Sequence, residues 1–332
     1  MKIAVLGSGG WGTALAMLLL ENGHDVSLWS YLPEESQHLA QTHENPLLPG
    51  VALPEGLRYT SDLDCVRGCG AVVMATPSFG VRSTAAAIRP LLDPSMVLIS
   101  VSKGIEKDTG LRMSELVREA TGGLCPVVAL SGPSHAEEVA RRVPTAVVSA
   151  CADQAAAELV QDLFLNERFR VYSSGDVIGV ELGAALKNVM ALCTGCCTGM
   201  GCGDNTKAML MTRGLAETAR LGVALGAKRD TFAGLAGMGD LIVTCTSMNS
   251  RNYRAGILIG QGVPVPEAIE RIGAVVEGYY AVVSARALAE RTGVEMPITQ
   301  AAYEVLYHGK DPNSVLTELM RRKKRHEMEE GW

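Results

Sequence analysis

Three glycines near the amino terminus have the spacing of a phosphate-binding turn. The stretch GSGGWG brings Gly7, Gly9 and Gly12 together, with an apolar run before it (residues 2–6) and another after it (residues 13–20). Gly7 would allow a tight turn, Gly9 would let a phosphate approach the backbone, and Gly12 would let a helix pack closely on a strand. Because a helix N-terminus offers unpaired N–H groups and a partial positive charge, the pattern predicts a site for a dinucleotide pyrophosphate.

The surroundings of these glycines support this interpretation. A chain with 36 glycines in 332 residues produces such spacings by chance, so the motif alone is weak. Here an apolar run precedes it, a helix-like segment follows it, and residues 25–29 alternate like a second strand. Strand, glycine turn, helix and strand within about 30 residues form the βαβ unit that the motif requires.

The residues after the second strand leave the choice between NAD and NADP open. An acidic residue there would bind the ribose hydroxyls of NAD, and a basic one nearby would accommodate the 2′-phosphate of NADP. The chain has Ser30 and Tyr31 at this place, while Glu34 and Glu35 resemble the first turn of the next helix. The sequence therefore predicts NAD or NADP as cofactor without a preference.

Lys103 stands in VSKGIE, directly after a strand-like run. Lysine is mostly exposed, so a surface position is the ordinary expectation. In an open α/β sheet, however, ligands bind at the carboxyl ends of the strands. This position favours a binding role for Lys103.

Lys187 lies in ELGAALKNVMAL, a helix-like segment that is otherwise largely apolar. Two interpretations are open, because a lysine on an apolar helix can extend its ammonium to the surface. If the ammonium were held in a cleft instead, desolvation and nearby cations would lower its pKa toward neutrality, as a general acid or base requires. Asp240, after Gly237 and Gly239, could orient this lysine, or could be a turn residue or helix cap.

Ser250, Arg251 and Asn252 combine a hydroxyl, a guanidinium and an amide. Arg251 could bind a phosphate in a bidentate manner, and the other two could add neutral hydrogen bonds. The alternative is a polar loop in which Ser250 is the N-cap of the next helix.

Composition restricts the class of protein. The 332 residues are 47% hydrophobic and 20% charged, which is typical of a globular protein of about two domains. The net charge of −6 argues against a nucleic-acid binder, and no apolar run is long enough for an integral membrane protein. Because Met1-Lys2 leads directly into a strand-like run rather than a signal peptide, we expect a cytoplasmic location.

Nine cysteines in such a chain are expected to be reduced. Four of them, Cys193, Cys196, Cys197 and Cys202, are close enough in sequence to suggest a metal site. Neither a histidine nor a second cysteine pair follows at zinc-site spacing, so buried thiols are favoured and no metal is predicted.

The pattern of strands and helices predicts an α/β fold. Six strand-like runs occupy residues 2–6, 25–29, 71–75, 96–100, 127–130 and 145–149. Helix-like segments, such as 81–92 and 110–121, lie between them, which predicts a Rossmann-type, doubly wound, mostly parallel sheet. The loops TPS, VSKG and SGPSHAEE should then lie at the same sheet edge as GSGGWG.

From about residue 180 the pattern becomes entirely helical. Helix-like segments occupy residues 180–197, 206–225, 230–240, 250–261, 265–271, 278–292, 297–307 and 313–321. We therefore predict a dinucleotide-binding domain at residues 1–180 and an all-helical substrate and catalytic domain at residues 181–332. The charged tail RRKKRHEMEE is expected to be a solvated helix terminus.

Several motifs, in order, resemble one family. The stretches GSGGWGTALA, SKGIE, SGPSHAEEVA, ELGAALKNV, GDNTKA, AGMGDL, NSRN and VVEG occur as in NAD(P)-dependent sn-glycerol-3-phosphate dehydrogenases of the bacterial, single-chain cytosolic type. The resemblance extends from residue 1 to about residue 310. It implies reversible reduction of dihydroxyacetone phosphate to sn-glycerol 3-phosphate with NADH or NADPH, which supplies phospholipid synthesis.

The resemblance also implies roles for individual residues. Lys187 resembles the family's proton donor and acceptor, with Asp240 beside it as a second catalytic residue. The implied substrate contacts are Lys103, Gly132, Ser134, Lys187, Asp240, Ser250, Arg251 and Asn252. The implied cofactor contacts, added to the glycines at positions 7, 9 and 12, are Gly10, Trp11, Tyr31, Lys103, Ala136, Arg251, Val275 and Glu277.

Tyr31 departs from the family pattern, in which an arginine commonly follows the tryptophan of the second strand. This argues against a strong NADP preference without establishing NAD. A phosphorylated small molecule is the expected partner, and the family suggests a homodimer.

Two other functions fit parts of the sequence. A related two-domain dehydrogenase of a β-hydroxyacid or a sugar acid phosphate would also have a catalytic lysine followed by asparagine, as in Lys187-Asn188. A non-enzymatic dinucleotide sensor would use the Rossmann half alone and would not need Lys187. The combination of SRN with GDNTKA favours glycerol phosphate.

Overall fold

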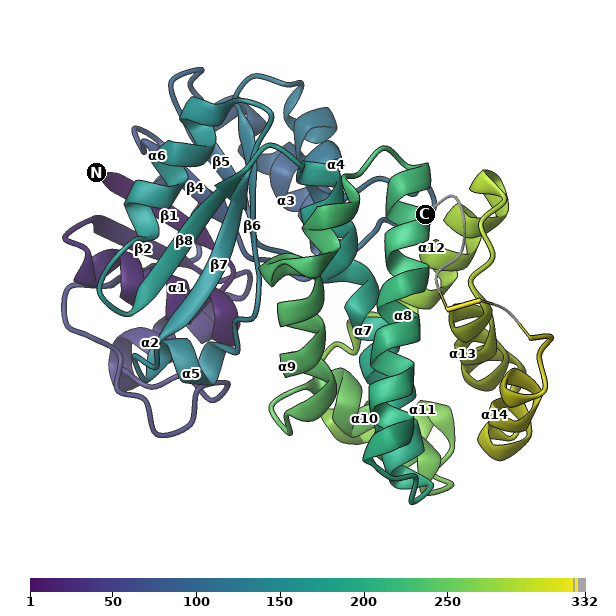
Figure 1. The fold of residues 1–332 in the computed structure, drawn as a ribbon. Helices are drawn as coiled ribbons and strands as arrows, with labels where there is room; N and C mark the ends of the chain where they lie inside the picture. The colour runs from purple at the N-terminus through teal and green to yellow at the C-terminus, as the bar shows by residue number, and fades with distance from the viewer. Residues whose placement is uncertain (325, 328–332) are drawn as a thin grey trace. The chain divides into compact units, whose positions relative to one another are not determined.

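The chain folds into two compact units, drawn in Figure 1. In the computed structural model, residues 1–324 and 326–327 are described. The first unit comprises Met1–Glu106 and Leu111–Glu181, and the second comprises Lys107–Gly110 and Leu182–Trp332. Helix α7 (Val177–Gly199) begins in the first unit and continues into the second.

The first unit is built on one sheet with the order β3-β2-β1-β4-β5-β6-β7-β8. Neighbouring strands are parallel, except that β6 and β7 are antiparallel. The strands are β1 (Lys2–Leu6), β2 (Asp25–Trp29), β3 (Arg58–Thr60), β4 (Ala71–Met74), β5 (Val97–Ser100), β6 (Val127–Ser131), β7 (Thr145–Ala150) and β8 (Phe169–Ser174). The predicted mostly parallel Rossmann-type sheet is thus confirmed.

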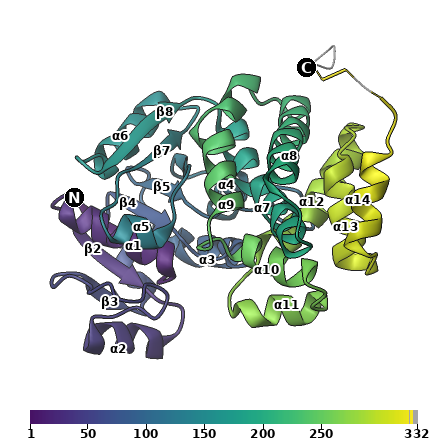
Figure 2. The same ribbon diagram turned by 60° about the horizontal axis from the view of Figure 1, so that its bottom comes forward.

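Both faces of the central part of this sheet are buried, which is why β1, β4, β5 and β6 are largely apolar. In β1, Ile3 and Val5 belong to one hydrophobic cluster, whereas Ala4 and Leu6 belong to the other. The helices that contribute to the first cluster include α1 (Gly10–Glu21), α5 (Ala136–Ala140) and α6 (Gln154–Phe164), and those that contribute to the second include α3 (Val81–Ile88) and α4 (Met113–Thr121). Figure 2 shows α2 (Pro33–Thr42) beside β3 at one end of the sheet and α6 beside β8 at the other.

The sequence pattern does not predict two of the strands. β3 has only three residues, so its period is too short to recognise. β8 buries Phe169 and Val171 but exposes Arg170 and Tyr172, so it reads as polar rather than as a buried strand. The prediction of six strands was therefore incomplete at the sheet ends.

The described residues of the second unit form helices and turns, which confirms the all-helical pattern. With α7, the helices are α8 (Asp204–Ala224), α9 (Asp240–Thr246), α10 (Arg251–Gly260), α11 (Val265–Ile272), α12 (Glu277–Thr292), α13 (Pro297–His308) and α14 (Pro312–Met320). α7 is long and apolar enough to span a bilayer, but 83% of its most apolar window is buried inside the protein. This burial is typical of a central helix in a protein core.

The helix-like segment predicted at residues 230–240 is helical but is not one regular α-helix. A 3₁₀ turn (Arg229–Ala233) and a π-helical turn (Leu235–Gly239) occupy that stretch, and α9 begins where the predicted helix ends. Gly234 adopts an extended conformation that separates the two turns, which a regular α-helix would not allow. As a result, Asp240 opens a helix that the sequence pattern assigns to a loop.

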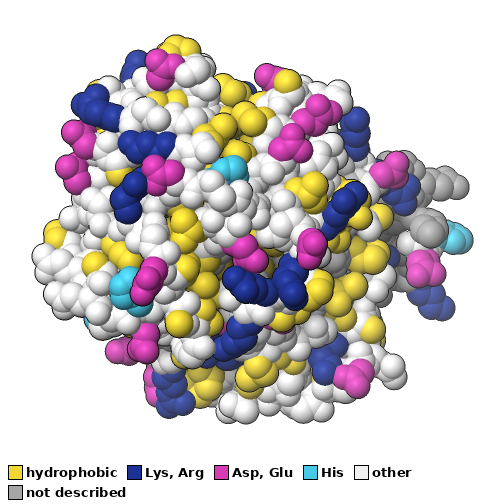
Figure 3. All heavy atoms as spheres, turned by 90° about the vertical axis from the view of Figure 1, so that its left-hand side faces the viewer, with side chains coloured by type: hydrophobic (Ala, Val, Ile, Leu, Met, Phe, Trp, Pro, Cys, Tyr) yellow, Lys and Arg dark blue, Asp and Glu magenta, His cyan; other side chains and the backbone are white. Residues whose placement is uncertain are grey.

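The surface and the cysteines agree with the composition. On the face shown in Figure 3, Lys and Arg side chains are interspersed with Asp and Glu and with hydrophobic side chains. All nine cysteines are unpaired, and Cys193, Cys196 and Cys197 belong to the second unit's hydrophobic cluster or pack against it. Burial raises the pKa of the Cys196 and Cys197 thiols to about 12, so they are protonated. Among residues 1–324 and 326–327, no group of three potential metal ligands is found.

Candidate functional site

The glycine turn between β1 and α1 has the geometry of a phosphate site. Gly7 has a φ of 123°, and a Cβ there would lie 2.7 Å from the carbonyl carbon of Ala75. A Cβ on Gly12 would lie 2.0 Å from the carbonyl oxygen of Gly7, so only glycine allows this close packing. Gly9 is the N-cap of α1, with no side-chain cap and no atom within 4 Å of its Cβ position. The first-turn N–H groups are thus uncovered by any side-chain cap, which fits a bound pyrophosphate.

Buried polar atoms at the sheet's carboxyl edge also fit a polar ligand. The indole Nε1 of Trp11 is buried without a hydrogen-bond partner, and so are the hydroxyls of Ser30, Thr76, Ser100 and Ser131. Ser100 and Ser131 end β5 and β6, while Ser30 directly follows β2. Unpaired buried polar atoms are rare in folded proteins, and here four of them lie at the end of a strand or just after it.

The end of β2 carries no cation. Tyr31 is 78% exposed and packs edge-on against Trp29, and residues 30–35 contain no Lys or Arg. Glu34 and Glu35 lie in the first turn of α2, and Glu35 accepts a long hydrogen bond, 3.4 Å, from the Ser8 hydroxyl. A carboxylate therefore lies beside the glycine turn.

Lys103 is held at the same edge of the sheet, as its position in the sequence predicts. Its Nζ donates to the Gly132 carbonyl oxygen at 3.0 Å and to the Ser134 hydroxyl at 3.5 Å. Gly132 has a φ of 150°, and a Cβ there would lie 2.9 Å from the Cα of Val147. The structure thus brings together Lys103, Gly132 and Ser134. Ala136 is the first residue of α5, and its Cβ lies 3.6 Å from the position that a Cβ on Gly10 would occupy.

In the second unit, Lys187 is at the centre of a buried polar cluster. Its Nζ lies 2.6 Å from Oδ1 of Asp240 and 2.5 Å from Oγ1 of Thr244, and the Lys187 and Asp240 side chains are only 8% and 1% exposed. Thr244 in turn donates to the backbone oxygen of Asp240 at 2.6 Å. The alternative in which Lys187 extends to the surface is therefore wrong. The carboxylate stabilises the protonated ammonium, the form that a proton donor requires.

Thr244 is a residue that the sequence patterns miss. Asp240 and Thr244 lie four residues apart in α9, so they share one helix face and both reach Lys187. The glycines before α9 conceal this helix from a periodicity argument. In a recognised helix, the spacing Asp-x-x-x-Thr would place Asp240 and Thr244 on one face.

Ser250 and Asn252 direct their polar groups into the protein. Ser250 accepts from the Tyr253 N–H at 3.2 Å and is the N-cap of α10, as one of the two sequence interpretations requires. Asn252 donates to Oδ1 of Asn188 at 3.1 Å and accepts from the Gly278 N–H at 2.8 Å. Asn252 on α10 thereby links Asn188, adjacent to Lys187, to the start of α12.

Arg251 differs from its two neighbours because it is exposed. It is the first residue of α10, a helix N-terminus, where the backbone also favours an anion. Among the three polar residues, Arg251 is the one placed to bind a phosphate from solution.

Four glycines let α7 and α10 approach closely. A Cβ at any of them would lie 2.0–2.2 Å from a backbone oxygen of the other helix. These residues are Gly195 and Gly199 on α7, and Gly256 and Gly260 on α10. Each pair is four residues apart, so each forms a small-residue strip on one helix face. The packing fixes the helix of Lys187 against the helix of Arg251.

The remaining predicted cofactor residues lie at the start of α12. Glu277 is the first residue of this helix and Val276 is its N-cap, with Val275 directly before it. Val275 and Glu277 are both half-buried.

Comparisons with known proteins agree across the chain. The family model for the N-terminus of NAD-dependent glycerol-3-phosphate dehydrogenase matches residues 2–157, and that for its C-terminus matches residues 176–317. Glycerol-3-phosphate dehydrogenase [NAD(P)+] from Moorella thermoacetica is 53% identical over 99% of this chain and 98% of its own. The enzyme of the same name from Shouchella clausii is 50% identical, with the same coverage.

A solved structure extends this similarity to three dimensions. Glycerol-3-phosphate dehydrogenase from Coxiella burnetii aligns with a TM-score of 0.92 at 38% identity, covering 96% of this chain and 98% of that one. The chain therefore belongs to the NAD-dependent glycerol-3-phosphate dehydrogenase family.

Proposed function

We propose that this protein reversibly reduces dihydroxyacetone phosphate to sn-glycerol 3-phosphate with NADH or NADPH. The observation that carries the proposal is the buried cluster of Lys187, Asp240 and Thr244 in a chain of this family. A dinucleotide sensor would not need a buried lysine held by a carboxylate and a hydroxyl, because burying an ion pair is costly.

The first unit binds the coenzyme, which supplies the hydride when bound. The N–H groups after Gly9 hold the pyrophosphate, and Gly10, Trp11 and Ala136 lie around that turn. Tyr31, at the end of β2, borders the adenosine ribose. We assign Lys103 to both coenzyme and substrate, and Gly132 and Ser134 to the substrate.

The second unit supplies the proton and the anchor for the phosphate. As the carbonyl at C2 is reduced, negative charge develops on its oxygen, and Lys187 stabilises and protonates it. Asp240 and Thr244 hold the ammonium in place, and solvent returns the proton that Lys187 gives up. Arg251 binds the phosphate, so that binding energy remote from C2 orients the carbonyl.

Ser250 and Asn252 support this anchor through the N-terminal turn of α10, rather than by direct contact alone. Val275 and Glu277, at the start of α12, complete the coenzyme contacts. The coenzyme function thus lies mainly within residues 1–180, and the catalytic function lies within residues 181–332.

The cellular setting follows from the proposed activity. We infer a cytoplasmic enzyme that supplies glycerol 3-phosphate to phospholipid synthesis and forms a homodimer. The negative net charge and the burial of α7 support a protein that is neither a nucleic-acid binder nor an integral membrane protein.

An absorbance assay distinguishes this function from its alternatives. The purified protein is incubated with NADH or NADPH and with dihydroxyacetone phosphate, unphosphorylated dihydroxyacetone, or a phosphorylated sugar acid and its oxidised form. We expect coenzyme oxidation with dihydroxyacetone phosphate and formation of sn-glycerol 3-phosphate. Turnover of the acids alone would support the related dehydrogenase, and coenzyme binding without any turnover would support the sensor.

A further inference from the structure

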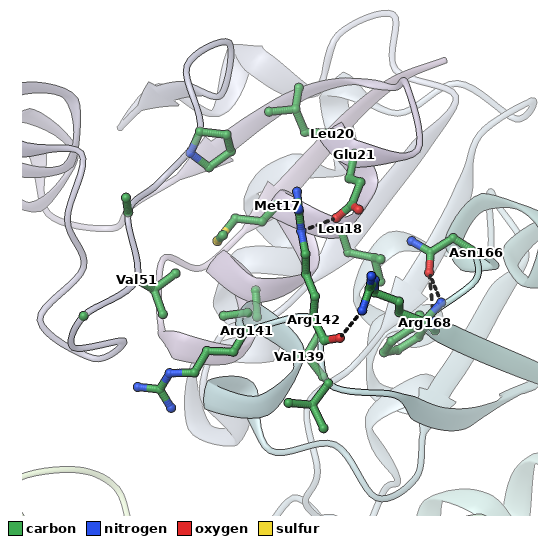
Figure 4. Close-up of a pocket in the computed structure, with 17 residues that line it drawn as sticks. Met17, Leu18, Leu20, Glu21, Val51, Val139, Arg141, Arg142, Asn166 and Arg168 are labelled. Atoms are coloured by element: carbon green, nitrogen blue, oxygen red, sulfur yellow. Dashed lines mark hydrogen bonds and ion pairs between the residues drawn. The ribbon is translucent and has the colours of Figure 1, made fainter.

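A second concave site lies in the first unit. Its volume is about 460 Å³, within the range of small-molecule sites, roughly 300–1,000 Å³. Its walls come from the second half of α1, the loop at residues 50–54, the segment after α5 and the start of β8 (Figure 4). None of the residues assigned above lines it. Along α1, Met17 is seven residues beyond Gly10, or about 10 Å at the rise of a helix.

The lining has an excess of positive charge. It contains the guanidinium groups of Arg141, Arg142 and Arg168 and a single carboxylate, that of Glu21. The chain as a whole has a net charge of −6, so the charge of this cluster is opposite in sign to the net charge of the protein. Three cations and one anion leave two positive charges at the cavity.

Backbone oxygens, rather than carboxylates, hold two of the three arginines. Arg141 donates to the Pro49 carbonyl at 3.0 Å, and Arg168 donates to the Arg142 carbonyl at 3.5 Å. The third, Arg142, forms an ion pair with Glu21 at 3.2 Å. In the described ranges of the chain, neither Arg141 nor Arg168 pairs with an acidic side chain. Within that part of the chain, no carboxylate neutralises their charge.

The backbone of Arg142 is strained. Its φ is 60°, and His43 is the only other non-glycine residue in the described ranges with a positive φ. Glycine or asparagine would adopt this conformation more easily than arginine. This conformation ends α5, because the Arg142 N–H donates to the Val139 carbonyl at 2.9 Å and the Val143 N–H donates to the Glu138 carbonyl at 3.0 Å, which sets the direction of the arginine segment after the helix.

Apolar side chains form the rest of the lining. Leu18 and Val51 are buried, Met17 is half-buried, and Val143 is 42% exposed beside the arginines. Figure 4 shows Met17 and Leu18 on α1 and Val51 on the neighbouring loop. The cavity thus combines a cationic edge with a surface suited to a hydrocarbon chain.

We propose that this cavity binds a phosphate monoester that carries an apolar chain. The dianionic phosphate contacts Arg141, whose guanidinium group matches phosphate in geometry and in charge and is held beside the loop of Val51 (Figure 4). The apolar chain of this ligand packs against Met17 and Val51. This site is separate from the proposed reaction and does not depend on it.

Calorimetry with matched probes tests the proposal on the full chain. The probe is n-octyl phosphate below its micelle concentration, with 1-octanol as the chain without charge and inorganic phosphate as the charge without chain. We expect n-octyl phosphate to bind at least about tenfold more tightly than either control, since hydrogen bonds to charged groups are the strong ones. The variant Arg141→Gln should raise its Kd at least about tenfold.

Arg170→Gln is the matched control. Arg170 is an exposed arginine on β8, two residues beyond Arg168, and it does not line the cavity but lies over the Tyr172 ring. It should leave the Kd unchanged, and circular dichroism should show that all variants are folded. Turnover without the probe should be the same in every variant, and its absence even in the unmodified protein would count against the proposed function alone.

Four results would overturn the proposal. They are equal binding of n-octyl phosphate and 1-octanol, equal binding of n-octyl phosphate and inorganic phosphate, an equal loss in Arg170→Gln, and displacement of the probe by NADH. The last of these would place the probe in the coenzyme site instead.

Discussion

At the residue scale, the roles proposed for Arg251 and Lys187 can be separated by experiment. Arg251 is exposed at the start of α10, whereas Lys187 is buried against Asp240 and Thr244. A group that binds the phosphate in both ground and transition states should affect substrate affinity, and a proton donor should affect the chemical step. The two side chains can therefore be told apart by steady-state kinetics.

Replacing Arg251 by alanine should raise the KM for dihydroxyacetone phosphate about tenfold or more, because a charged hydrogen bond contributes roughly 1.5–3 kcal/mol. The matched control is Arg271→Ala on α11, an exposed arginine paired with Glu267. Steady-state kinetics at saturating coenzyme gives the comparison. An unchanged KM in Arg251→Ala would show that this residue does not anchor the phosphate.

Coenzyme choice is also a residue-scale matter. No cation stands at the end of β2, and Glu35 lies beside Ser8 of the glycine turn. Its negative charge would repel the 2′-phosphate of NADPH. We expect kcat/KM to be higher with NADH, and the double variant Tyr31→Arg with Glu35→Gln to shift the ratio toward NADPH by roughly tenfold. With Glu34→Gln as the control, a ratio that does not move would exclude this part of the chain as the selector.

At the element scale, glycine packing positions α7, the helix that carries Lys187. A Cβ on Gly256 would lie 2.2 Å from the Leu192 carbonyl oxygen, so alanine there must push α10 from α7. Overpacking of this kind costs about 1–3 kcal/mol. We expect Gly256→Ala to lower the Tm by several degrees and to reduce kcat/KM, because Arg251 and Lys187 lie on the two displaced helices.

Gly175→Ala is the control for this substitution. Gly175 precedes α7 and has no atom within 4 Å of its Cβ position, so the added methyl group should change neither property appreciably. Equal Tm and equal kinetics in the two variants would contradict the packing account.

The stability of the second unit is expected to depend on pH through a buried carboxyl group at the start of α13. Glu217 on α8 accepts the N–H groups of Ile298 and Thr299, and burial raises its pKa from 4.5 to about 7. Because the folded state holds this proton more tightly than the unfolded one, the stabilisation is full below pH 4.5 and is lost as the pH rises through 7. The loss amounts to about 3 kcal/mol at most.

Thermal unfolding of the protein and of Glu217→Gln between pH 5 and 8 checks this. The glutamine variant cannot titrate at this position, so the Tm of the unmodified protein should fall relative to it as the pH rises. Parallel Tm profiles, or a rise instead of a fall, would show that Glu217 does not titrate in this range.

At the scale of the whole molecule, local sequence patterns predict the features that depend on neighbouring residues. They do not predict the features that depend on contacts between distant residues. The glycine turn, six strands and the helical second half follow from period and composition, because each depends on neighbouring residues. The reversed direction of β7 and the edge strand β3 depend on the rest of the sheet, and no local pattern encodes them. Likewise, Asn252 bonds to Gly278, 26 residues away, so its supporting role appears only in the fold.

The site shows the same division. Lys103 and Lys187 could be selected from their position after a strand and on an apolar helix. Thr244 could not, because the glycine-rich turn before α9 interrupts the helical period. The cavity lined by Arg141 and Arg168 combines segments from distant parts of the chain, so no single motif marks it.

The most direct test of the central claim compares the unmodified protein with Lys187→Ala. Oxidation of NADH by dihydroxyacetone phosphate is followed by absorbance, and coenzyme affinity is measured by fluorescence titration on the same preparations. The account predicts turnover by the unmodified protein, a loss of kcat by a factor of about 10²–10⁴ in the variant, and nearly equal affinity for NADH in both. Turnover by Lys187→Ala at the unmodified rate, or no oxidation of either coenzyme by the unmodified protein, would contradict it.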